Sequence, residues 1–133
     1  MKTTFLKLVI VFALIVLFSA PACWAKTNGY CYLISYSLRD KVVFFTPVFT
    51  AKVSGAIYSE EEFVADVELI RDIENQFQEY LAKIGLNTMD YLTEARVAYR
   101  TAAIAEQRRS KEKSSFESRG YTVKAPGSFR YRD

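Results

Sequence analysis

The most hydrophobic stretch of this 133-residue chain lies in its first 25 residues, and its pattern is that of a secretory leader. Lys2 and Lys7 precede an uncharged apolar run over residues 8–18, and small residues follow as far as Ala25. This order is typical of a signal peptide that is removed from the mature protein. The fold must then be built from the remaining 108 residues, which we expect to form a single domain over residues 26–133.

Three fates of this leader are compatible with its residues. A cut after Ala25 makes the protein periplasmic or secreted, and this is the outcome that we expect. A cut after Ala22 leaves Cys23 at the new terminus, as in a lipoprotein, although the preceding residues lack the leucine usual in such sites. An uncleaved leader offers 18 uncharged residues against the about 20 that span a bilayer, but Pro21 interrupts them. Either alternative would hold the protein at the membrane of the cell envelope.

Charge limits the classes of partner. The mature chain has an excess of one basic residue, because two of the 18 basic residues lie in the leader and all 15 acidic residues lie beyond it. We therefore expect no nucleic-acid partner. Acidic residues are concentrated in 60–95 and basic residues in 96–133, which predicts either two mutually neutralising segments or a basic binding face.

One cysteine, Cys31, remains after a cut at Ala25, so no internal disulfide framework supports the fold. Its apolar strand context indicates a buried small side chain. The alternative is an intermolecular disulfide, and a bridge to Cys23 becomes possible if that residue is retained.

Two segments predict a β-hairpin. Residues 30–37 alternate, with Tyr30, Tyr32, Ile34 and Tyr36 on one face and Cys31, Leu33, Ser35 and Ser37 on the other. A polar turn over 38–41 leads to a second strand over 42–50 that is apolar on both faces. Pro47 cannot donate a ladder hydrogen bond, so we expect it at an edge or a bulge.

Helical periodicity dominates the middle of the chain. Ser59 and Glu62 form a capping box ahead of an apolar stripe that predicts a helix over 59–84, and Gly85 supplies its C-cap. A second helix is expected from Asn87 or Thr88, with a stripe formed by Leu92, Ala95, Tyr99 and Ala102. The short link between them predicts an antiparallel helical hairpin. The polar segment 106–118 is expected either to extend that helix into solvent or to fray, with Phe116 as its anchor and Gly120 at its end.

The predicted fold class is α+β. Residues 121–124 and 129–132 are expected to form one or two short strands that complete a small antiparallel sheet with the N-terminal hairpin. The helical hairpin would cover one face of the sheet and leave the face with Tyr30, Tyr32 and Tyr36 exposed.

The residue inventory argues against an enzyme. The chain has no histidine, which removes the commonest general base and zinc ligand, and its five glycines form no phosphate-binding loop. We expect no catalytic residue, cofactor or metal site. A carboxylate-based hydrolase is a weak alternative, because the acids follow one helix face, as do the pairs Glu62 with Asp66 and Glu68 with Asp72 that have metal-ligand spacing.

The remaining signals favour a protein that binds another envelope or secreted protein, as an inhibitor, immunity factor or accessory subunit. Tyrosine is abundant, and tyrosine is enriched at protein interfaces. The candidate contact residues are Tyr30, Tyr32 and Tyr36 on the sheet, and Arg108, Arg109, Lys111 and Lys113 in the basic segment. The alternative is a structural envelope protein held by its anchor or by lipid. The sequence makes no prediction of the oligomeric state.

Overall fold

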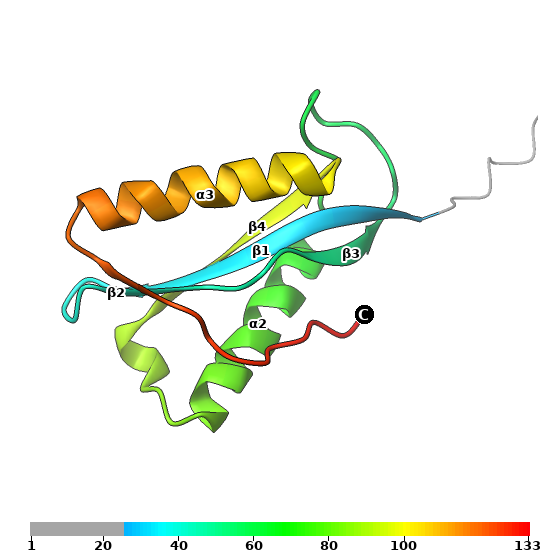
Figure 1. Cartoon of the computed structure of the whole chain (residues 1–133). Coiled ribbons are helices and arrows are strands. Elements are labelled where there is room, and N and C mark those ends of the chain that lie inside the picture. Colours follow the sequence, from blue (N-terminus) through cyan, green and yellow to red (C-terminus); the bar gives the residue numbers. More distant parts are fainter. Residues whose placement is uncertain (1–25) are drawn as a thin grey trace, which may run out of the picture.

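A computed structural model describes residues 26–133; the predicted leader and both alternatives at Cys23 lie outside the described residues. The fold is α+β: a mixed five-stranded sheet lies between two helices (Figure 1). In chain order the elements are β1 (Thr27–Ser37), β2 (Val42–Phe45), β3 (Phe49–Val53), α2 (Val67–Lys83), a 3₁₀ turn (Thr88–Asp90), β4 (Leu92–Tyr99), α3 (Ala102–Ser118) and β5 (Thr122–Lys124).

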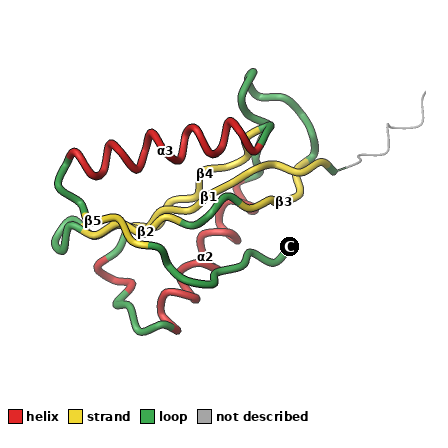
Figure 2. Tube along the Cα trace, in the orientation of Figure 1, coloured by secondary structure: helices red, strands yellow, loops and turns green. Residues whose placement is uncertain are grey.

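Strand β1 is the centre of the sheet. Along one edge it pairs antiparallel with β4, and along the other it pairs first with β3 and then with β2. The predicted hairpin is therefore confirmed, but its second strand is interrupted around Pro47, where the Thr46 hydroxyl accepts a hydrogen bond from the Leu33 amide at 2.9 Å. Strand β5 pairs parallel to β2 at the far edge, so the sheet is mixed and the prediction of an antiparallel sheet is wrong (Figure 2).

Alternation along β1 divides the core into two clusters. Cys31 and Leu33 face α2, where they pack with Ile73, Phe77 and Leu81. On the opposite face, the cluster beneath α3 contains Tyr32, Ile34, Val43, Phe45, Tyr99, Ala105, Phe116 and Tyr121. The expectation that helices cover only one face is therefore wrong. The reason lies in β1 itself, because a strand that is apolar on both faces requires cover on both sides.

Helix α2 begins eight residues later than the capping box predicted. Asp66 is the N-cap and accepts a hydrogen bond from the Glu68 amide at 3.2 Å. Ser59 does accept from the Glu62 amide at 3.1 Å, but this bond closes a turn instead of starting a helix. Pairing to the end of β4 competes with helix formation there, since the Phe63 amide donates to Ala98 at 2.9 Å. The predicted C-terminal boundary is confirmed by Gly85, whose φ is 93°.

The predicted helical hairpin is wrong, because β4 separates the two helices in sequence and the sheet separates them in space (Figure 1). Asn87 caps only the 3₁₀ turn, through a 3.2 Å hydrogen bond from the Met89 amide. The sequence of Leu92–Tyr99 fits both a helix and a strand. Its apolar residues fall at helical spacing, whereas Glu94 and Arg96 alternate with small side chains at the two-residue period of a strand. Pairing of the whole of β4 with residues 30–36 of β1 outweighs helix propensity here.

Helix α3 starts after the N-cap Thr101 and extends through the polar segment to Ser118, beyond which Gly120 has a φ of 86°. Of the two alternatives for residues 106–118, the helical one is confirmed, with Phe116 buried, but the helix starts at Ala102 and not before β4. Of the two expected C-terminal strands, the first is β5, whereas residues 129–132 form no strand.

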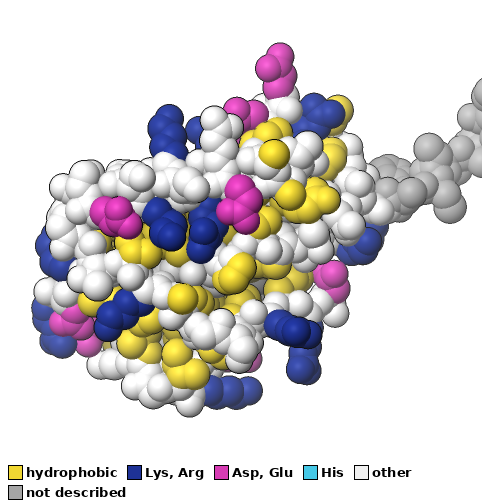
Figure 3. All heavy atoms as spheres, viewed as in Figure 1, with side chains coloured by type: hydrophobic (Ala, Val, Ile, Leu, Met, Phe, Trp, Pro, Cys, Tyr) yellow, Lys and Arg dark blue, Asp and Glu magenta, His cyan; other side chains and the backbone are white. Residues whose placement is uncertain are grey.

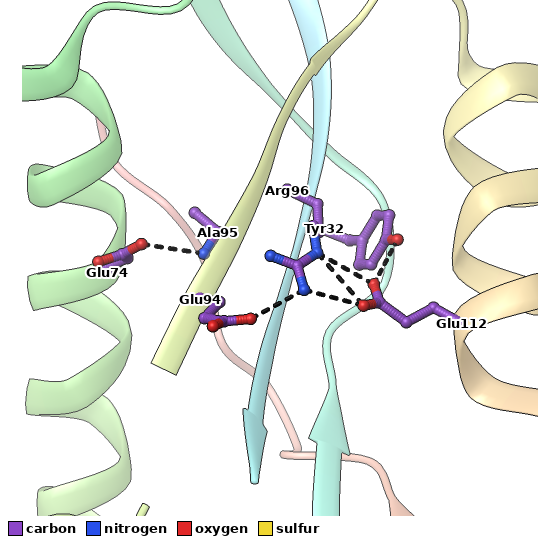
Figure 4. Close-up of polar contacts among 6 residues, drawn as sticks. All are labelled: Tyr32, Glu74, Glu94, Ala95, Arg96 and Glu112. Atoms are coloured by element: carbon purple, nitrogen blue, oxygen red, sulfur yellow. Dashed lines mark hydrogen bonds and ion pairs between the residues drawn. The ribbon is translucent and has the colours of Figure 1, made fainter. Parts of the chain in front are cut away.

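The outer edge of β4 is covered by other parts of the chain. The Ala95 amide donates to the Glu74 carboxylate of α2 at 3.1 Å (Figure 4). Farther along, Arg100 donates its amide to the carbonyl of Glu61 at 2.8 Å, so residues 61–63 continue the sheet there.

Gly29 allows β1 to lie close to Ala98 of β4. A Cβ atom at this position would lie 2.6 Å from the Ala98 Cβ. We expect Gly29→Ala to lower the free energy of unfolding by about 1–3 kcal/mol through overpacking, measured by urea denaturation. The double variant Gly29→Ala with Ala98→Gly should recover most of that loss. Equal stability of the wild type and the single variant would contradict this account.

Candidate functional site

A surface depression of about 300 Å³ lies where α3 crosses β1 and β4, and we call it the α3 seam. Its lining residues are Tyr32, Arg96, Tyr99, Arg108, Lys111, Glu112 and Ser115. The seam brings together three of the residues predicted to contact a partner: Tyr32, Arg108 and Lys111. They come from one strand and one helix that are far apart in sequence, and the sheet–helix packing alone places them side by side.

The floor of the seam is a network of charged hydrogen bonds (Figure 4). The Glu112 carboxylate accepts from the Arg96 guanidinium, with N–O distances of 3.2 Å from Nε and 2.9 Å from Nη2. The Tyr32 hydroxyl donates to the same carboxylate at 2.7 Å, and Arg96 also binds Glu94 at 2.8 Å. Because bidentate Arg–carboxylate pairs have a fixed geometry, this network holds α3 at a defined position over the sheet.

Burial and neighbouring charges determine the protonation states of Tyr32 and Arg96 in this network. Burial raises the pKa of the Tyr32 hydroxyl, and the hydrogen bond to Glu112 raises it further. For Arg96, burial lowers the pKa, but hydrogen bonding and charge from Glu112 and Glu94 outweigh burial and leave the pKa above its usual value. Tyr32 therefore stays neutral and Arg96 stays cationic, so the network has the properties of a structural clamp.

A second depression, of about 590 Å³, adjoins the seam and shares Tyr99 and Arg108 with it. Residues 59–62 form its other wall. Arg108 crosses between the two depressions and forms an ion pair with Glu61. This ion pair links α3 to the turn that precedes α2, and both of its side chains are close to half exposed.

The predicted tyrosine face is not exposed. Tyr32 is 1% exposed, and Tyr30 and Tyr36 are half-buried against the cluster beneath α3. Tyr36 packs on Phe116 and Tyr121 with ring centroids 5.4 and 6.4 Å apart. The expectation of an open sheet face is therefore wrong, because α3 occupies the position that was left vacant in the predicted hairpin of helices.

The predicted basic residues separate into different environments. Arg109 donates its Nε to the Thr46 carbonyl at 2.7 Å and lies over the Phe45 ring, so it fastens α3 to the interruption between β2 and β3. Lys113 is half-buried and does not line the seam. Arg108 and Lys111 remain as the exposed cations of the predicted set.

Cys31 is fully buried, as expected of a small core side chain, and it pairs with no other residue of 26–133. Burial raises the pKa of its thiol to about 12, and the nearby charge of Asp133 adds to the effect. The alternative of an intermolecular disulfide stays a prediction, and it would require the core around the buried sulfur to open.

The carboxylates are dispersed. Among residues 26–133, no three side chains of His, Cys, Asp or Glu come together as a potential metal site. Glu62 and Asp66 precede α2 instead of sharing a helix face, and Asp72 accepts hydrogen bonds from Gln76 and Tyr131, both at 3.2 Å. Within the same residues, neither helix has the length and apolar character that a bilayer crossing requires.

Sequence reasoning missed Arg96, Tyr99 and Glu112 as residues of the site. Each omission follows from reading β4 as helix, since a helical Arg96 would point elsewhere. The available signal was the alternation of Glu94 and Arg96 with small residues, which has the two-residue period of a strand.

Removing the charge of Glu112 tests the clamp. We expect Glu112→Gln to lower the free energy of unfolding by about 1–2 kcal/mol, because Arg96 loses its bidentate partner in a half-buried setting. Chemical denaturation measures the change. Glu117→Gln, an exposed substitution on the same helix, should stay within about 0.5 kcal/mol of the wild type; equal effects of the two would contradict the clamp.

The raised pKa of Tyr32 predicts instability at alkaline pH. Below the ordinary tyrosine pKa of 10.0 both states hold the proton, and above it the unfolded chain releases the proton first, so stability falls as pH rises. We expect Tyr32→Phe to be less stable at neutral pH but to lose less stability per pH unit between about pH 10 and 11. A wild-type slope in Tyr32→Phe would contradict the prediction.

Comparison with known proteins gives no relative: no family model matches the sequence, no curated protein matches it, and no solved structure matches it significantly. The function is therefore argued from the residues of the α3 seam and from the rest of the described surface.

Proposed function

We propose that this chain is an exported, non-enzymatic protein that binds another envelope protein, as an inhibitor, immunity factor or accessory subunit, and that it docks through the α3 seam. The observation that carries the proposal is the grouping of the exposed cations Arg108 and Lys111 around two adjoining depressions, with the buried Tyr99 at their base. Arginine is among the residue types that most often dominate binding energy at protein interfaces.

The charges of the seam suit a polar partner surface. Lys111 is exposed and has no ion pair within residues 26–133. Arg108 is held only by Glu61 in an exposed pair, and such pairs contribute little to stability, so a partner carboxylate can replace Glu61 at small cost. Figure 3 shows basic and acidic side chains interspersed with apolar patches over the face in view.

The network beneath the seam supports this role by reducing the entropy lost on binding. The contacts of Glu112 with Arg96 and Tyr32 fix α3 before a partner arrives. A surface already held in its bound arrangement loses less conformational freedom on association, which favours affinity. In this proposal the network of Glu112, Arg96 and Tyr32 positions α3, and the exposed side chains of Arg108 and Lys111 contact the partner.

Site-specific photo-crosslinking in cells that export the chain tests the proposal. A photoreactive residue in place of Lys111 should yield one defined crosslinked protein, whereas the same residue in place of Gln78, exposed on α2 beyond the opposite face of the sheet, should not yield it. Lys111→Glu should then weaken binding of that protein about tenfold or more in a titration, and Lys52→Glu should leave its Kd within about twofold. Capture that does not depend on position would contradict docking at the seam.

A further inference from the structure

The last eight residues of the chain, 126–133, cross α2 on the side of the sheet opposite the seam, and we call them the tail (Figure 1). Phe129 packs on Phe77 and Tyr80, with ring centroids 5.0 and 5.6 Å apart, and on Phe49 at 6.2 Å. Tyr131 packs on Phe49 at 5.7 Å. Two aromatic side chains separated by one residue therefore point into the same surface.

The backbone of the tail is held by side chains of α2. Gln76 forms two hydrogen bonds with Arg132: its Nε2 donates to the Arg132 carbonyl at 2.8 Å, and its Oε1 accepts from the Arg132 amide at 3.0 Å. The Tyr80 hydroxyl donates to the Pro126 carbonyl at 2.6 Å. Sites that recognise extended peptides combine the same two kinds of contact: backbone hydrogen bonds provide affinity, and pockets for alternate side chains provide specificity.

Apart from the buried Pro126, the tail lies on the outside of the core that it covers. It belongs to no helix or strand, and its two aromatic side chains are only partly buried. Beneath it, Ile73, Phe77 and Leu81 are already packed against β1. Segments with few buried contacts and exposed backbone hydrogen bonds open locally at a free energy below that of global unfolding.

We propose that the surface formed by Phe49, Gln76, Phe77 and Tyr80 is a binding site for an extended peptide of a partner protein that carries two aromatic side chains two residues apart. The tail is the internal ligand of this site, and the partner segment replaces it. The site lies on the other face of the sheet from the seam and does not depend on the function proposed above. A depression of about 480 Å³ lies between α2 and the tail, where Glu79 and Lys83 face tail residues 128–132, so these two side chains also border the position that the incoming segment would take.

Because the tail is covalently joined to the site, a partner segment must exceed a minimum affinity to replace it. A segment joined by a short link acts at an effective concentration on the order of millimolar, so a free peptide of equal intrinsic affinity competes only near that concentration. A partner must therefore bind more tightly than the tail or be held close by. The tail therefore excludes weakly binding segments from the site.

Peptide binding to the full chain with a weakened tail tests the site. The probe is a fluorescent peptide with the sequence of residues 126–133, and fluorescence anisotropy measures its binding. We expect the variant Phe129→Ala with Tyr131→Ala to bind the probe about tenfold or more tightly than the wild type, in which the tail competes. Adding Gln76→Ala to that variant, or replacing both aromatic residues of the probe by alanine, should weaken binding about tenfold.

Two results would overturn the proposal in this assay. One is a folded variant, shown by circular dichroism, that binds the aromatic and the alanine probes equally or binds neither at millimolar concentration. The other is a variant that fails to fold, because the tail would then be an inseparable part of the core. Lys111→Glu, which tests the seam, should leave probe binding unchanged, so the two proposals can fail separately.

Hydrogen exchange in the unmodified protein provides a second measurement. The Arg132 amide should exchange at least about 100-fold faster than the Phe77 amide within α2, because it is freed when the tail opens locally. Millimolar unlabelled peptide should raise the Arg132 rate further and leave Phe77 unchanged. Equal protection of the two amides, or no response to the peptide, would overturn the proposal.

Discussion

The central constraint on this fold is that β1 carries large apolar side chains on both faces. Cys31 and Leu33 point one way and Tyr32 and Ile34 the other, and all four are fully or almost fully buried. One layer cannot bury both sets, so the chain must place a helix on each side of the sheet. The positions of α2, α3 and the two binding surfaces proposed here all follow from that requirement.

Much of the local structure was predictable because it depends on short-range signals. The alternation in residues 30–37, the turn after it, the glycine ends of both helices and the fold class follow from propensity and periodicity. The capping box at Ser59 shows the limit of such signals, since the Ser59–Glu62 bond forms but tertiary pairing of Phe63 with β4 takes the next residues out of the helix. Segment 92–99 shows the same limit, because strand pairing is a long-range property that no local window contains.

The candidate site was only partly predictable for the same reason. Arg108 and Lys111 could be selected as exposed cations from composition alone, whereas the floor beneath them required knowing that β4 and α3 both contact β1. Helix α3 has a weak apolar face, with only Ala105 and Phe116 buried, so polar contacts through Glu112 and Arg109 fix it in place. A mostly polar helix held by hydrogen bonds keeps its outer surface available for recognition.

The edges of the sheet determine how the molecule behaves among copies of itself. A free strand edge is a template on which another chain can add. Here Glu74 engages the Ala95 amide, residues 61–63 cover the end of β4, and β5 presents only three residues at the far side. The β4 side and the β5 end of the sheet thus offer little open edge on which a second chain could add a strand, which limits strand-linked aggregation there.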